Sequence, residues 1–155
     1  KRIITPLHEL GYVVHTVSAE QEGVYGLRAA LPAGFAGRAF VLDLGSGNTK
    51  LAWVEQGQPR TTDTYGAKYY QQGIDDATVA GAVRAAARQV PAGQRATCFV
   101  LGGVPHELAK ANRQGQERYT PLRPAAEYTA PDNGAKRQAG LTIYRAVQEA
   151  TGCQQ

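Results

Sequence analysis

The residues best suited to chemistry stand together, where an apolar segment ends in Asp43 and a glycine-rich turn follows. A carboxylate at the end of a strand can hold a divalent cation that keeps several waters and bridges to phosphate oxygens, so Asp43 is the predicted ligand of Mg²⁺. Glycines in the turn allow a positive φ and a close approach of the backbone to an anion. Amides and polar side chains would then cradle phosphate. The predicted phosphate-binding residues are Gly45, Ser46, Gly47, Asn48, Thr49 and Lys50.

A simpler interpretation of the same turn is a β-hairpin that needs Gly and Asn for positive φ. That interpretation explains the glycines but leaves Asp43 without a role. A second glycine pair, Gly102 and Gly103, precedes a predicted helix and would offer free amides and the positive end of the helix dipole to another anion. A tight strand-to-helix turn is the alternative there. No residue is assigned as catalytic, because no Ser/His/Asp or Cys/His arrangement is present.

Composition limits the function classes. The net charge of +4 comes from 17 basic and 13 acidic residues that are scattered along the chain, so nucleic acid is not an expected partner. No apolar run of membrane-spanning length occurs, so no membrane partner is expected either. The two cysteines have no CxxC spacing and are interpreted as reduced thiols, which fits a cytoplasmic setting.

Periodicity predicts the elements that position these residues. Ser18, with Gln21 three residues on, predicts the start of a helix that Pro32 ends. A period of two between residues 38 and 64 predicts three antiparallel strands, with Phe40, Leu42 and Leu44 on one face and Leu51 and Trp53 on another. The other predicted elements are strands at 12–17, 96–101 and 119–122, and helices beginning at Asp75 or Asp76 and covering about 105–112 and 136–150.

From residue 38 the predicted order is β-β-β-α-β-α-β-α, which is the order of the ribonuclease H-like α/β fold with a mixed sheet. This unit is built twice in actin-like ATPases. The chain holds one full copy, preceded by a helix, a strand and a crossover helix. Residues 1–34 are therefore interpreted as a remnant of a first lobe with the crossover helix, and residues 35–155 as the second lobe.

Four segments, in order, make the chain resemble the exopolyphosphatase and guanosine pentaphosphate phosphatase family. They are residues 17–23 (Val-Ser-Ala-Glu-Gln-Glu-Gly), 43–50 (Asp-Leu-Gly-Ser-Gly-Asn-Thr-Lys), 65–70 (Tyr-Gly-Ala-Lys-Tyr-Tyr) and 100–109 (Val-Leu-Gly-Gly-Val-Pro-His-Glu-Leu-Ala). The resemblance implies a phosphohydrolase lobe that binds polyphosphate or guanosine polyphosphates with Mg²⁺. It also implies a partner, either the missing first lobe of the same protein or another copy in a homo-oligomer.

Lys50 departs from the family pattern, which has a glutamate at this position. An ammonium cannot serve as a carboxylate base or as a ligand for a hard metal. The missing first lobe is the larger departure, because one lobe supplies only half of the electrostatic clamp on the transferring phosphoryl group, and we therefore expect little or no turnover by these residues alone. Two alternatives are a non-catalytic ligand-sensing or scaffold descendant of the family, and an actin-like ATP-binding assembly module, whose loops share the Thr-Lys ending.

Overall fold

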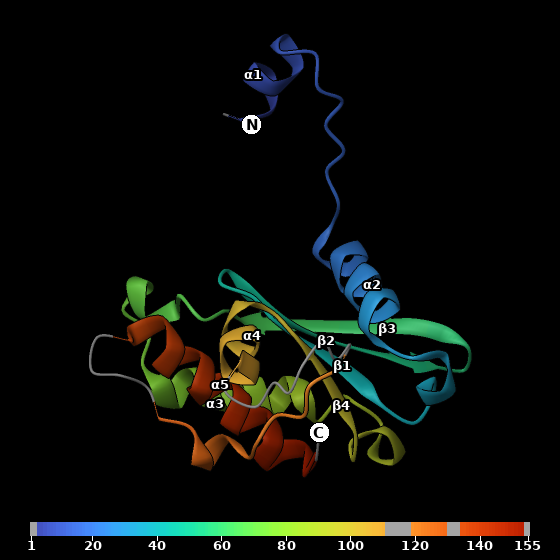
Figure 1. The fold of residues 1–155 in the computed structure, drawn as a ribbon, viewed down its shortest axis with the longest axis vertical. Coiled ribbons are helices and arrows are strands. Elements are labelled where there is room, and N and C mark those ends of the chain that lie inside the picture. Colours follow the sequence, from blue (N-terminus) through green and yellow to red (C-terminus); the bar gives the residue numbers. More distant parts are fainter. Residues whose placement is uncertain (1–2, 111–118, 130–133, 154–155) are drawn as a thin grey trace.

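The computed structural model describes residues 3–110, 119–129 and 134–153 and shows an α/β fold (Figure 1). One mixed sheet carries α2 (Ala19–Ala30) on one face. The other face is covered by α3 (Asp76–Ala87), α4 (Gly103–Lys110) and α5 (Ala135–Thr151). The predicted fold class is confirmed at this level. No described helix has the length and apolar character needed to cross a membrane.

The sheet has the order β3-β2-β1-β4 in the described part of the chain. The predicted antiparallel meander is confirmed as β1 (Phe40–Leu44), β2 (Asn48–Glu55) and β3 (Gln58–Tyr65). The two-residue turn between β2 and β3 has positive φ at both Gln56 and Gly57, as tight hairpins require. β4 (Cys98–Leu101) adds to β1 in parallel, so the carboxyl ends of β1 and β4 lie at one edge.

The main core lies between the sheet and helices α3, α4 and α5. Phe40 is opposite Trp53 and Leu42 is opposite Leu51 in the pairing of β1 with β2, and all belong to this core. The prediction that the two strands use different faces was wrong, because residues directly opposite in a ladder point to the same side. On the other face of the sheet, Leu27 and Ala30 of α2 form a smaller cluster with Val41 of β1 and Ala52 of β2.

Helix boundaries follow the predicted signals closely. The side chain of Ser18 accepts from the amide of Gln21, whose side chain accepts from the Ser18 amide, so the predicted capping box of α2 is confirmed. Asp75 caps α3 through the Thr78 amide. The apolar residues at helical spacing in the segments of α3 and α5 are buried in the core, except for half-buried Ala150. They are Val79, Val83, Ala86 and Ala87 of α3, Val90 just after α3 ends, and Ala139, Ile143 and Val147 of α5.

The prediction of strands at residues 12–17 and 119–122 was wrong. Residues 12–17 are extended but pair with no strand among the described residues, and they connect a short helix, α1 (Ile4–Glu9), to α2. Their β-branched composition favours a strand only where a sheet edge is available, and none lies beside them (Figure 1). Residues 119–122 lie near β4, since the Tyr119 ring packs on Phe99, but they form no ladder with it. Pro121 lacks the N–H that a ladder requires.

The predicted order therefore holds from β1 to α4, and its last strand is absent from the described residues. The predicted helix at 105–112 begins earlier, at Gly103, because the His106 amide donates to Gly102 O. Its last two predicted residues lie outside the described part. The division expected after residue 34 falls in the connection between α2 and β1, and α2 itself packs on the sheet. Cys98 and Cys153 are both buried, and neither forms a disulfide.

Candidate functional site

The two predicted glycine turns meet at the carboxyl ends of β1 and β4. Gly102 follows β4 with φ of 116°, and a Cβ atom at this residue would clash with the carbonyl oxygen of Leu44, the last residue of β1. Only glycine combines this positive φ with such a close backbone approach. Gly102 therefore brings the N-terminus of α4 against the start of the loop that joins β1 to β2.

The β1–β2 loop is fixed by the segment that follows β3. The amide of Ala67 donates to Gly45 O at 2.9 Å, and the amide of Lys68 donates to Ser46 O at 3.0 Å. A Cβ on Gly66 would lie 2.5 Å from Gly47 C, so this glycine lets the two segments touch. Gly66 was not predicted as a site residue. Its place in the family-like segment at residues 65–70, just after the third strand of a meander, was the signal in the sequence.

The loop glycines do not have the predicted positive φ, and that part of the prediction was wrong. Gly45 is needed for a different reason, because a Cβ there would lie 2.5 Å from Asn48 O across the turn. At Gly47 a Cβ would contact nothing within 4 Å, and the residue is exposed. Gly47 thus leaves an open approach to the loop backbone.

Unpaired amides lie on both turns. Within the described residues, the amides of Ser46 and Gly47 donate no hydrogen bond. The amides of Gly103 and Val104 are in the first turn of α4, where no intrahelical acceptor exists, and Pro105 has no N–H. Because these turns are in contact through Gly102, the edge of the sheet presents several amide donors together with the positive end of a helix.

Thr49 does not face this edge. Its side chain is fully buried, opposite Leu44 in the sheet, and its Oγ1 has no hydrogen-bond partner among the described residues. Alternation along β2 sends neighbouring Lys50 to the other face. The predicted phosphate-binding residues are therefore divided, with the Thr49 hydroxyl in the core and the Lys50 ammonium beneath α2.

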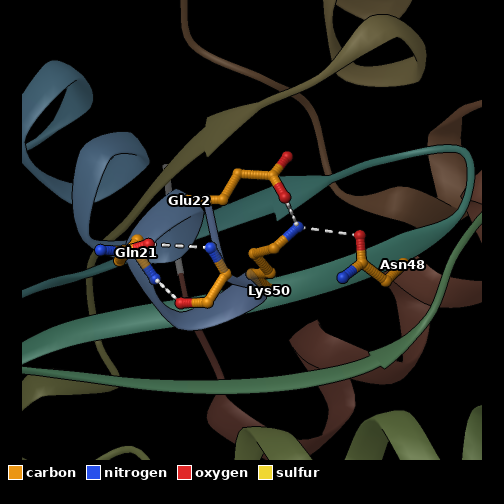
Figure 2. Close-up of polar contacts among 5 residues, drawn as sticks. Gln21, Glu22, Asn48 and Lys50 are labelled. Atoms are coloured by element: carbon orange, nitrogen blue, oxygen red, sulfur yellow. Dashed lines mark hydrogen bonds and ion pairs between the residues drawn. The ribbon is translucent and has the colours of Figure 1, made fainter. Parts of the chain in front are cut away.

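Lys50 is the centre of a polar network between the sheet and α2. Its side chain is only 3% exposed, and its Nζ forms an ion pair with Glu22 Oε2 at 2.8 Å. The same Nζ donates to Asn48 Oδ1 at 2.8 Å. Figure 2 shows the lysine between the Glu22 carboxylate from α2 and the side-chain amide of Asn48, the first residue of β2. The network thereby connects α2 to the start of β2, where the β1–β2 loop ends.

Asp43 lies beside this network on the same face of the sheet. It is directly opposite Lys50 in the pairing of β1 with β2, and it is half-buried under α2. Burial raises the pKa of the Asp43 carboxyl, the positive charge of Lys50 opposes that rise, and the negative charge of Glu22 adds to it. The Asp43 carboxylate therefore lies in a less polar environment than a carboxylate that is fully hydrated.

The donor set around Asp43 does not fit Mg²⁺. The nearby oxygen atoms that could bind a metal belong to Glu22 and Asn48, and both already contact the Lys50 ammonium. The positive charge of Lys50 therefore lies where Mg²⁺ would have to bind. No group of three or more His, Cys, Asp or Glu residues in the described ranges is arranged to hold a metal ion. The assignment of Asp43 as a metal ligand stays a prediction.

A comparison with protein families found no family model that matches this chain, and a comparison with curated proteins found no match either. The geometry at the ends of β1 and β4 therefore carries the functional interpretation. It brings together Gly45, Ser46, Gly47, Gly102 and Gly103, with Asn48 at the boundary between the loop and the network. Two cavities are near it. A small polar crevice of about 220 Å³ lies between Ala19 and Thr62 beside Lys50, and a larger groove of about 760 Å³ extends from Gly102 along β4.

Proposed function

We propose that this chain is the second lobe of a ribonuclease H-like, actin-like fold and binds phosphate chains, either polyphosphate or a guanosine polyphosphate. An antiparallel meander followed by a helix and a strand parallel to β1 supports this fold. The other elements of the predicted order, including a further strand after α4, belong to the proposal. The likeness to the exopolyphosphatase family rests on the four ordered sequence segments.

The contact between Gly102 and Leu44 is the observation that carries the proposed ligand. It joins the unpaired amides of Ser46 and Gly47 to the unpaired amides of Gly103 and Val104. Backbone amides from a loop and a helix N-terminus stabilise phosphate oxygens by hydrogen bonds and by the helix dipole. Adjacent phosphate groups of one chain could each use one of the two turns.

Binding without hydrolysis by the chain alone is part of the proposal. Attack on a phosphate by water requires a group that orients or deprotonates the water and a clamp on the developing charge. Here Lys50 is paired with Glu22, and Asp43 is half-buried under α2. A first lobe or a second copy of the chain would have to supply the missing groups.

The ion pair between Lys50 and Glu22 favours a second candidate, the non-catalytic ligand-sensing descendant. In that case phosphate binding alone would be the activity, and α2 would respond through Lys50 and Asn48 to ligand in the loop. The actin-like assembly module stays a prediction, which nucleotide-dependent sedimentation would test.

The binding test uses calorimetry with tripolyphosphate and with guanosine tetraphosphate. Gly47→Asp and Gly103→Asp each add a carboxylate at a position where a Cβ contacts nothing, so both variants should fold. A like charge close to the ligand should weaken binding by about tenfold or more. Gly93→Asp is the matched control, because Gly93 is exposed, equally unobstructed and outside both turns. Equal affinities for all three variants would contradict the proposed site.

A further inference from the structure

Lys50 carries the only buried charge among the residues that the structure describes. An ammonium taken out of water is unfavourable unless oxygen atoms replace its hydration. Glu22 and Asn48 provide two such atoms, each 2.8 Å from Nζ (Figure 2). Asp43 lies directly across the β1–β2 ladder on the same face.

The groups around this ammonium form a set that hard cations prefer. The Glu22 carboxylate from α2 and the Asn48 amide oxygen from the start of β2 contact the Lys50 ammonium, and the Asp43 carboxylate comes from β1, directly opposite Lys50 in the ladder. Oxygen ligands of this kind, with one or two carboxylates, hold divalent cations in proteins. Lys50 supplies one positive charge to the same groups through the chain itself.

We propose that the Lys50 ammonium occupies the place of a divalent cation, so that the site binds its phosphate ligand without a metal ion. The statement about the ligand rests on the proposed function, whereas the statement about the cation does not. Lys50 is a positioning and specificity-determining residue here. It holds Asn48, at the start of β2, to Glu22 of α2, and it excludes a metal from the oxygens that it uses.

Replacing the ammonium should convert these oxygens into a metal site. Lys50→Met keeps the length of the side chain and removes its charge, which leaves Asp43 and Glu22 near one another without a cation. Mn²⁺ binding, followed by calorimetry and by electron paramagnetic resonance, should be unsaturable in the wild-type chain. In Lys50→Met it should be saturable at one site and tighter by about tenfold or more, as expected for exposing a paired carboxylate set to a divalent ion.

Two controls isolate the effect. Lys136→Met removes an exposed lysine of α5 and should leave Mn²⁺ binding as in the wild type. Asp43→Asn combined with Lys50→Met should abolish the acquired site. If Lys50→Met does not fold, the wild-type chain still decides the question. Saturable Mn²⁺ binding by the wild type that disappears in Asp43→Asn would overturn the inference.

The phosphate arm separates this inference from the proposed function. Tripolyphosphate should bind the wild-type chain equally, within about twofold, with a chelator or with Mg²⁺ present. Binding that requires Mg²⁺ would overturn the inference and leave the proposed function standing. Absence of binding under both conditions would contradict the proposed function. The Mn²⁺ measurements alone would then test whether the Lys50 ammonium takes the place of a divalent cation.

Discussion

At the scale of single residues, the stability of the site depends on how the buried Lys50 ammonium is paired. In the described structure, Glu22 is the only carboxylate that forms an ion pair with Lys50, and Glu22→Gln removes its charge. Because Glu22 is about half exposed, water can compensate in part, and we expect a loss of about 1–2 kcal/mol in the free energy of unfolding. Urea denaturation measures this loss. Glu20 is in the same turn and forms no ion pair with any described residue, so Glu20→Gln should change the free energy of unfolding by less than about 0.5 kcal/mol. Equal losses would contradict the pairing.

Asp43 should respond to pH in the opposite sense from a carboxylate stabilised by a salt bridge. Burial raises its pKa in the folded chain above the ordinary value of 3.8, so the folded state binds the proton more tightly than the unfolded state. Its ionisation therefore lowers stability progressively as pH rises from below 3.8 through the raised pKa, and the loss is complete above that pKa. Asp43→Asn removes this loss. The variant should be more stable than the wild type at pH 7, and the difference should disappear at pH 3 in thermal unfolding curves. A constant difference at all pH values would show that charge is not the cause.

At the scale of elements, the closeness of α2 to the sheet depends on one of its glycines. A Cβ at Gly23 would lie 2.9 Å from Thr61 Cγ2 on β3, whereas at Gly26 it would lie 3.5 Å from Leu101 Cδ1, an ordinary contact. Alanine within a helix is favoured over glycine by about 0.5–1 kcal/mol. Gly26→Ala should therefore stabilise the chain by about that amount. Gly23→Ala should destabilise it by about 1 kcal/mol, because α2 must shift away from Thr61 and from Lys50. Chemical denaturation of both variants tests this, and a stabilised Gly23→Ala would show that α2 is not tightly seated.

The sequence predicted elements well where the signal was local. The capping box at Ser18 and Gln21 and the cap at Asp75 satisfy amides a few residues away, so their spacing alone was sufficient. The strands expected at 12–17 and 119–122 failed because a strand needs a partner, and β-branched composition does not show whether one is present. The glycine turns were found, but their purpose was not. Gly45 and Gly102 are required by backbone contacts with Asn48 and Leu44, and such contacts depend on register.

The candidate site was predictable only in part for the same reason. The loop from Gly45 to Asn48 and the turn at Gly102 were recognisable as segments, and the structure brings them to one edge. The ion pair of Lys50 with Glu22 was not predictable. It depends on which face of β2 turns toward α2 and on where that helix crosses the strands. Alternation along β2 could have separated Thr49 from Lys50, since adjacent strand residues face opposite sides.

At the scale of the whole molecule, the N-terminal arm, residues 3–17, stands away from the body (Figure 1). None of the residues of α1 is buried, and the arm exposes large apolar side chains on Ile3, Leu10, Tyr12, Val13 and Val17. α2, by contrast, packs on the sheet through Leu27 and Ala30. The arm therefore adds little to the stability of the body and offers apolar surface to another partner.

Deletion of residues 1–17 tests both statements. We expect the deletion to leave the Tm within about 2 °C of the wild type, because no residue of α1 is buried and residues 3–17 contain no strand. Leu27→Ala is the contrasting variant and should lower the free energy of unfolding by about 2–4 kcal/mol, since Leu27 is only 3% exposed where α2 packs on the sheet. Sedimentation velocity over a range of concentrations then addresses the partner. Association by the full chain that the deletion removes would support a homo-oligomer built through the arm. If the full chain and the deletion variant are both monomers, a separate first lobe is favoured as the partner that covers these side chains. A large drop in Tm on deletion would show that the stability of the body depends on the arm.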